Sequence, residues 1–485
     1  MGKTIALSFN YDRGMRRDHS REQLPRGSAW DLVDYLPSVG APLRKRGGWL
    51  YASPTLPGQQ FVAAAAYVPY RAGPRLVAFG NTGNLFDVGP TFQTNKGAAV
   101  VPFQTSFHKE LLIIPDSTGA SSPKTYSGST LGTLSSAPKA RFTATWNERT
   151  IAGGVPGAEY TVYFSNPGDP QGWDTGNAWQ NASFPLMGFA VLSSVILLFS
   201  PVGVERFRGS APPPGGNLIR EWVSERGCID PRSIAIWKSM AIWANTDGIF
   251  LTDGAVVSDL LRSGEMSQYW TQVVTSQTPP NAAGWTFSGV VWQDYYIMSV
   301  LNGATPVDTL LCDLTTRSWF RITNVFTMAF AASTAAAEEL YFGLRDEPRL
   351  ASGSSMWDPK ASNKNDADGH VIMPILETAF TPLGPETRLR NVFLGHLLKD
   401  VTDENPALLS DNPSLTVGFV TSPEDTSYES LNPSIYHAPH YRRSKIPVRR
   451  RANGFGFRVA QEGPSADTRL FGFELEGYPL EQTRP

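Results

Sequence analysis

Short apolar runs separated by turn-forming residues recur along most of the chain. The clearest unit holds three apolar runs with two hairpin signals between them: residues 236–244, Thr246-Asp247-Gly248, residues 249–251, Thr252-Asp253-Gly254 and residues 255–261. Asp-Gly supplies the positive φ that a tight hairpin needs. The pattern therefore predicts strand, turn, strand, turn, strand, which is one blade of a β-propeller.

Units of this kind begin near residue 60 and recur roughly every 40–50 residues, a spacing typical of propeller blades. We predict an all-β fold with a six- or seven-bladed β-propeller over residues 60–362. Residues 1–59 are unlike the repeats and are expected to form an extended segment that helps to close the ring. Residues 363–485 carry longer alternating runs, as in 468–478, which predict a separate C-terminal β-domain that packs on the propeller or closes it.

Composition agrees with an all-β chain and narrows the function classes. The sequence has 13 Trp, 26 Phe, 16 Tyr, 44 Gly and 38 Pro, while charged residues are 18%. A net charge of −2 excludes a chain that binds nucleic acid by its overall charge. Cys228 and Cys312 are expected to be buried free thiols. The uncharged stretch 182–204 contains Pro185 and Gly188, so we expect two buried strands and no membrane insertion.

Chemistry-bearing residues form no catalytic pattern. Asp247, Asp253 and Asp313 lie in turn signals where Asp is expected for backbone reasons, and Asp294 has no partner that the sequence names. His437 and His440 are close together but have no third metal ligand beside them. Motifs of serine hydrolases, P-loop NTPases, zinc proteases and EF-hands are absent from the sequence. We therefore predict no catalytic residue, no metal and no cofactor, and expect that the chain is not an enzyme.

Two clusters of cations remain as candidates for contact with other molecules. The first is Arg44, Lys45 and Arg46, and the second is Arg442, Arg443, Lys445, Arg449, Arg450 and Arg451. One interpretation is a solvated loop for the first cluster and a solvated edge strand for the second. The other is contact with a neighbouring subunit, an acidic protein or DNA phosphate. These residues are our assembly-contact candidates.

Four stretches, in consistent order, resemble one known family. They are residues 24–32 with 44–49, the turn Tyr163-Phe164-Ser165-Asn166-Pro167-Gly168-Asp169-Pro170 with Trp173-Asp174, residues 227–234 with 247–254, and residues 469–476. Together they resemble the β-propeller structural proteins of bacteriophage tails, the nozzle or tail-hub family of short-tailed phages.

The resemblance implies a virion protein that is assembled in the host cytoplasm. Such proteins form a homo-oligomeric ring, usually a hexamer, below the portal and its adaptor, and genomic DNA passes through the lumen during ejection. A DNA conduit should not grip phosphates, because releasing many counterions would stall passage. We therefore predict that residues 442–451 face a protein partner or a ring neighbour and not the lumen.

Two alternatives belong to other classes. A tail protein that binds a receptor or carbohydrate could stack Trp285, Trp292 and Trp357 on sugars. A propeller glycosidase, which we rank third, would need two carboxylates on either side of a glycosidic bond, and Asp294 is the residue to test.

Overall fold

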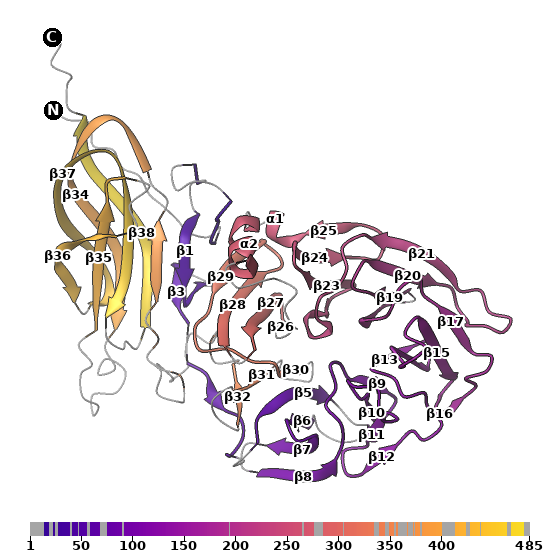
Figure 1. Cartoon of the computed structure of the whole chain (residues 1–485). Coiled ribbons are helices and arrows are strands. Elements are labelled where there is room, and N and C mark those ends of the chain that lie inside the picture. The colour runs from indigo at the N-terminus through magenta and orange to yellow at the C-terminus, as the bar shows by residue number, and fades with distance from the viewer. Residues whose placement is uncertain are drawn as a thin grey trace.

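The computed structural model describes the chain in segments. These are residues 14–18, 23–24, 28–38, 41–46, 48–55, 59–67, 75–89, 92–193, 195–263, 266–275, 285–303, 305–333, 339–344, 349–353, 356, 366, 372, 374–378, 381–399, 413–422, 427–436, 438–462 and 467–479. Two parts lie side by side in Figure 1, a ring of small sheets and a sheet of long strands.

Seven antiparallel blades, each of four or five strands, surround a common axis in the described part of the chain (Figure 1). In chain order, the first four blades are β5 (Phe61–Tyr67), β6 (Arg75–Gly80), β7 (Asn84–Gly89) and β8 (Phe92–Ala98); β9 (Ser106–His108), β10 (Leu111–Ile114), β11 (Lys124–Tyr126) and β12 (Leu131–Thr133); β13 (Phe142–Trp146), β14 (Arg149–Gly153), β15 (Thr161–Asn166), β16 (Asp169–Trp173) and β17 (Trp179–Asn181); and β18 (Gly188–Leu192), β19 (Val195–Phe199), β20 (Val204–Arg208) and β21 (Ile219–Ser224). The last three are β22 (Ala235–Trp237), β23 (Met240–Asn245), β24 (Gly248–Thr252) and β25 (Val257–Asp259); β26 (Trp285–Trp292), β27 (Tyr295–Asn302), β28 (Thr305–Asp313) and β29 (Ser318–Arg321); and β30 (Phe330–Ser333), β31 (Glu339–Gly343), β32 (Leu350–Ser352) and β4 (Leu50–Tyr51). The chain is thus an all-β protein with a seven-bladed β-propeller.

The seventh blade takes its last strand from the N-terminal segment. β4 pairs antiparallel with β32, with Tyr51 opposite Ala351 and Leu50 opposite Ser352. Residues near the start of the chain therefore hydrogen-bond to a strand about three hundred residues later, and this pairing closes the ring without a covalent link.

The fifth blade corrects two expectations about strand boundaries. The apolar run 236–244 is not one strand but the hairpin β22–β23, which turns at Lys238 with φ +54°. The run 255–261 divides between β25 and a short helix, α1 (Leu260–Ser263), which α2 (Ser267–Thr275) follows. Lysine carries no turn signal, because most side chains disfavour positive φ, so the pattern could not mark this hairpin.

The uncharged stretch 182–204 contains the two predicted strands, and the two cysteines are the predicted buried thiols. β18 and β19 pair antiparallel and are joined through Ser193, which has φ +52°. Every helix among the described residues is too short or too polar to span a bilayer. Cys228 and Cys312 are buried free thiols.

The long-stranded sheet is continuous with the sixth blade. Its strands are β33 (Ile375–Thr378), β34 (Thr381–Lys399), β35 (Ser414–Val420), β36 (Glu429–Tyr436), β37 (Ala438–Glu462) and β38 (Asp467–Pro479), together with β1 (Ala29–Val33), β2 (Tyr35–Ser38) and β3 (Ala41–Lys45) from the N-terminal segment. β1 lies parallel to β29 on one side and antiparallel to β33 on the other. Hydrogen bonds therefore run unbroken from the propeller into the C-terminal sheet, giving one sheet of 13 strands.

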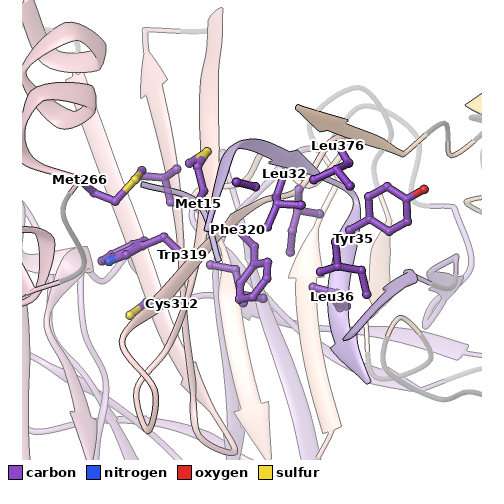
Figure 2. Packing of buried hydrophobic residues seen from close by; sticks show 14 of the residues in the cluster. Met15, Leu32, Tyr35, Leu36, Met266, Cys312, Trp319, Phe320 and Leu376 are labelled. Carbon is purple, nitrogen blue, oxygen red and sulfur yellow. The ribbon is translucent and has the colours of Figure 1, made fainter. Parts of the chain in front are cut away.

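A shared apolar core reinforces this junction (Figure 2). Met15 and Trp319 lie toward the propeller, Leu32 and Phe320 lie between the two parts, and Leu376 lies toward the C-terminal sheet. All five side chains are buried. Because burial of apolar surface drives packing at about 25 cal/mol per Å², this common core opposes separation of the two parts. We therefore treat the propeller and the C-terminal sheet as one unit.

Candidate functional site

A cavity of about 650 Å³ lies on the propeller axis. It receives residues from the first strand of every blade, namely β5, β9, β13, β18, β22, β26 and β30. Its volume falls within the roughly 300–1,000 Å³ range of small-molecule sites. Two large apolar side chains on its wall are unusually open, with Phe107 40% exposed and Ile236 46% exposed.

Hydroxyl groups supply much of the polar lining of this axial cavity. The hydroxyls of Ser106 and Thr143 lie 2.9 Å apart and share a hydrogen bond between the second and third blades. Ser288 donates to the carbonyl of Met328 at 3.1 Å, and so links the sixth blade to the seventh. The polar part of the wall is thus mostly uncharged.

Arg232 is the one charged residue among the described residues that line the axial cavity. It lies on the 3₁₀ turn η1 (Pro231–Ser233), which Asp230 caps by accepting from the Arg232 backbone N–H at 2.9 Å. Nη1 of Arg232 lies 3.3 Å from the Asp230 carboxylate, and the guanidinium carbon lies 4.7 Å from the centre of the Phe103 ring. Burial raises the pKa of Asp230, against the lowering effect of Arg232. The guanidinium is therefore held in one orientation at the cavity wall.

Sequence reasoning missed Arg232 as a site residue, although a local signal was present. Asp followed by Pro is a common start of a helical turn, with Asp as the cap and Pro at the first position. That signal fixes the turn but does not say that the turn faces the propeller axis, which depends on how seven blades close.

The first basic cluster is not a solvated loop. Arg46 is 1% exposed, and its guanidinium contacts Asp34 at 2.7 Å and both oxygens of Asp366 at 2.8 and 2.9 Å. It also donates to the carbonyl of Thr323 at 3.0 Å. Burial disfavours the charge, but the two carboxylates outweigh it, so the pKa of Arg46 is raised.

This geometry overturns the assembly-contact prediction for Arg46 and Lys45. Both side chains are buried within the chain, where a neighbouring subunit does not reach them. Arg44 is half-buried and pairs in register with Arg469 of β38. Its role as an assembly contact stays a prediction.

The second basic cluster lies on β37, and its first three members are exposed. These are Arg442, Arg443 and Lys445, whose strand pairs with β34. The Arg443 guanidinium lies 4.0 Å and the Lys445 ammonium 6.0 Å from the centre of the Phe393 ring. Such cation–π contact holds a cation over a ring while leaving its outer side to solvent or a partner.

The other members of the second cluster are placed by backbone register. Arg450 lies opposite Leu389 and Arg451 opposite Arg388, with Arg449 next to them; the side chains of these three arginines are outside the described set. In the described register, β33 and β35 pair with β37 only from residue 456 onward. Edge strand and partner contact thus stay as alternatives for residues 442–451.

Three aspartates are turn residues, as the sequence predicts. Asp253 accepts from the backbone N–H groups of Ala255 and Val256 at 2.8 and 2.9 Å. Asp313 caps its own turn in the same way. Asp247 lies in the β23–β24 turn, where it pairs with Arg226.

Asp294 and two of the proposed sugar-stacking tryptophans lie in surroundings that do not suit the roles considered for them. Asp294 accepts from Trp237 Nε1 at 2.8 Å and pairs with Lys238 at 3.1 Å, and these contacts lower its pKa. A general acid in a glycosidase needs a raised pKa instead. Trp292 is buried, so it is not a sugar platform, and Trp285 is half-buried and stacked on Phe287.

The remaining chemical candidates lie partly beyond the described residues. Trp357 and His437 fall outside them, as does the side chain of His440. No group of three His, Cys, Asp or Glu residues gathers to hold a metal in the parts of the chain that were described.

No protein-family model and no curated protein matches the chain. Similar solved structures include a computationally designed protein, Ika8 (12% identity over 62% of this chain and 99% of that chain, TM-score 0.40). They also include BBS1N in complex with ARL6DN (11%, 65% and 99%, TM-score 0.42) and the Neurospora crassa Pan2 WD40 domain (10%, 64% and 94%, TM-score 0.40). These likenesses concern the propeller and carry no argument about function.

Proposed function

We propose that the protein is a structural component of a bacteriophage tail, of the nozzle or tail-hub type found in short-tailed phages. In this role it forms a homo-oligomeric ring, with a hexamer as the expected form, below the portal and adaptor, and continues the DNA-ejection channel. The proposal starts from the resemblance of residues 24–32 with 44–49, 163–170 with 173–174, 227–234 with 247–254, and 469–476 to that family.

The observation that supports it best is the continuous sheet through β1. A ring closes only if every subunit meets its neighbour at the same fixed angle. β1 joins the propeller to the C-terminal sheet by hydrogen bonds on both of its sides, and Leu32 anchors it in the shared core. Such a subunit can present two faces at a constant angle, which suits a ring.

The proposed role assigns the DNA path to the space enclosed by the ring of subunits. The axial cavity within one propeller has the volume of a small-ligand site and is unsuited to a DNA duplex. In this arrangement Arg442, Arg443 and Lys445 contact a neighbouring protein, in keeping with their exposure on β37.

The experiment is reconstitution with the neighbouring proteins. The full chain is co-expressed with the portal and adaptor of the same phage, and the purified material is imaged by negative stain. We expect a ring of this protein attached below the adaptor. A chain that stays monomeric at every concentration and does not bind the portal–adaptor ring would overturn the proposal.

A second candidate is a tail protein that binds a receptor on the host surface. The axial cavity favours it, because Phe107 and Ile236 are open to solvent on a wall rich in hydroxyl groups. Binding of the purified protein to host cells, without binding to the portal–adaptor ring, would favour this second role.

A further inference from the structure

We propose that the axial cavity binds a small acidic saccharide, of one or two rings, that carries one carboxylate. Three features of the wall point to this class: one oriented guanidinium, a set of hydroxyl groups, and an open aromatic face. The site goes beyond the tail role and does not depend on it, because the cavity lies within a single propeller.

The guanidinium of Arg232 is the feature that selects an anion. Asp230 uses Nη1, and the guanidinium carbon lies over the ring of Phe103, but the side chain stays 20% exposed. No hydrogen bond among the described residues uses Nη2. A carboxylate can therefore accept from Nη2 without displacing Asp230, in a charge-assisted hydrogen bond.

The ion pair of Arg232 and Asp230 limits the negative charge that the ligand can carry. Arg232 shares its single positive charge with the carboxylate of Asp230, which is itself buried. A dianionic phosphate would bring two negative charges close to that carboxylate, and like charges in a poorly solvated site repel each other. One carboxylate is the better match.

The hydroxyl groups explain why the ligand is a sugar and not a simple fatty acid. Ser106 and Thr143 share one hydrogen bond, so at least one of the two hydroxyls can still donate, and both can still accept. Thr105 and Ser193 add hydroxyls that are half-buried and exposed, and Gln104 adds an amide. An alkyl chain would leave these groups without partners, at a cost in binding.

Phe107 supplies the apolar contact that a sugar ring needs. Its ring lies nearly parallel to Tyr67, with centres 5.8 Å apart and planes at 20°, so the side chain is held in place. Its exposed part, together with Ile236, offers a surface for the C–H face of a saccharide. The wall therefore combines apolar and polar contacts on one ligand-sized cavity.

The test is ligand-observed NMR by saturation transfer, followed by titration, with glucuronate and N-acetylneuraminate as probes. Glucose serves as the neutral comparator and hexanoate as the anionic comparator without hydroxyls. We expect at least one probe to bind. Glucose should bind at least about tenfold more weakly because it lacks the charged hydrogen bond to Arg232, and hexanoate should also bind at least about tenfold more weakly because it leaves the hydroxyl groups without partners.

Variants assign the binding to this cavity. Arg232→Gln should weaken binding of the acidic probe about tenfold or more, and Phe107→Ala should weaken its binding severalfold. Arg226→Gln is the matched control, because Arg226 is an exposed arginine that pairs with Asp247 and does not line the cavity. Thermal melts of each variant establish that the propeller is intact.

Several outcomes would overturn the proposal. They are absence of saturation transfer for both probes, equal binding of glucose or hexanoate, and unchanged probe affinity in a folded Arg232→Gln variant. Ring formation with the portal and adaptor is scored separately, so failure of the saccharide site leaves the tail role standing, and the reverse also holds.

Discussion

Two basic clusters that look alike in the sequence have opposite environments. Arg44-Lys45-Arg46 leads to a buried guanidinium, whereas Arg442, Arg443 and Lys445 are exposed on a strand. The difference lies in residues far away along the chain. Arg46 meets Asp34, 12 residues earlier, and Asp366, 320 residues later, while the second cluster meets the ring of Phe393.

A run of cations in a sequence therefore does not show whether its side chains are buried or exposed to solvent. A buried charge persists only with partners that satisfy it, because desolvation of an ion costs several kcal/mol. Around Arg46 those partners are Asp34 in the β1–β2 turn, the carbonyl of Thr323 after β29, and Asp366. Arg46 therefore ties three separate segments together, whereas Arg442, Arg443 and Lys445 lie exposed on one strand.

The largest loss of stability is expected when Arg46 is replaced. Arg46→Ala should destabilise the chain by about 3–5 kcal/mol, because it leaves two buried carboxylates without their cation. Urea unfolding followed by tryptophan fluorescence measures this change. Arg442→Ala is the matched control and should stay within about 0.5 kcal/mol, as exposed substitutions usually do. Similar losses in both variants would refute the contrast between the clusters.

A smaller loss of stability is expected when one of the two carboxylates that contact Arg46 is changed. Asp366→Asn keeps the shape of the side chain but removes its charge, and should cost about 1.5–3 kcal/mol, the usual value for a hydrogen bond to a charged group. A double-mutant cycle with Arg46→Ala isolates the coupling between the two residues. Additive losses would mean that the contact seen at 2.8 Å contributes nothing to stability.

The C-terminal sheet should respond to acid through His396, which is buried opposite Arg442 in the β34–β37 register. Burial lowers the pKa of His396 below its ordinary 6.5, and Arg442 lowers it further, against the effect of the Leu394 carbonyl. The unfolded chain then binds more protons below about pH 6.5, so stability is full above that pH and falls as the pH drops.

Urea midpoints at about pH 7.5 and about pH 5.5 measure this dependence. His396→Gln cannot gain a proton in this range, so it should lose less stability between the two pH values than the native chain does. An equal loss in both proteins would assign the acid response to other groups.

The local parts of the fold could be predicted from the sequence. Asp-Gly turns and alternating apolar runs indicate blades, and the Asp253 and Asp313 turns form as expected, because these signals act over a few residues. Lys238 is an exception even at short range, because no turn-forming residue type at this position signals its positive φ.

Long-range pairings could not be predicted from the same pattern. The parallel pairing of β1 with β29, the closure of blade seven by β4 and the contact of Arg46 with Asp366 each join residues about three hundred positions apart. A periodic pattern states which residues form strands but not which strands meet. For the same reason the sequence could not predict the axial cavity, because its lining comes from all seven blades.

Substitution of the exposed cations on β37 should have the smallest effect on stability and a large effect on assembly. Replacing Arg442, Arg443 and Lys445 together with Ser should change the free energy of unfolding by only about 0.5 kcal/mol, because all three side chains are exposed. In the proposed ring these cations contact an acidic partner, so ring formation with the portal and adaptor should fail. A control with Lys139, Arg208 and Arg226 changed to Ser removes the same charge from the exposed surface of the propeller and should still assemble. If both triple variants assemble equally well, charge at β37 is not what the neighbouring protein recognises, and the second cluster is a solvated strand like many others.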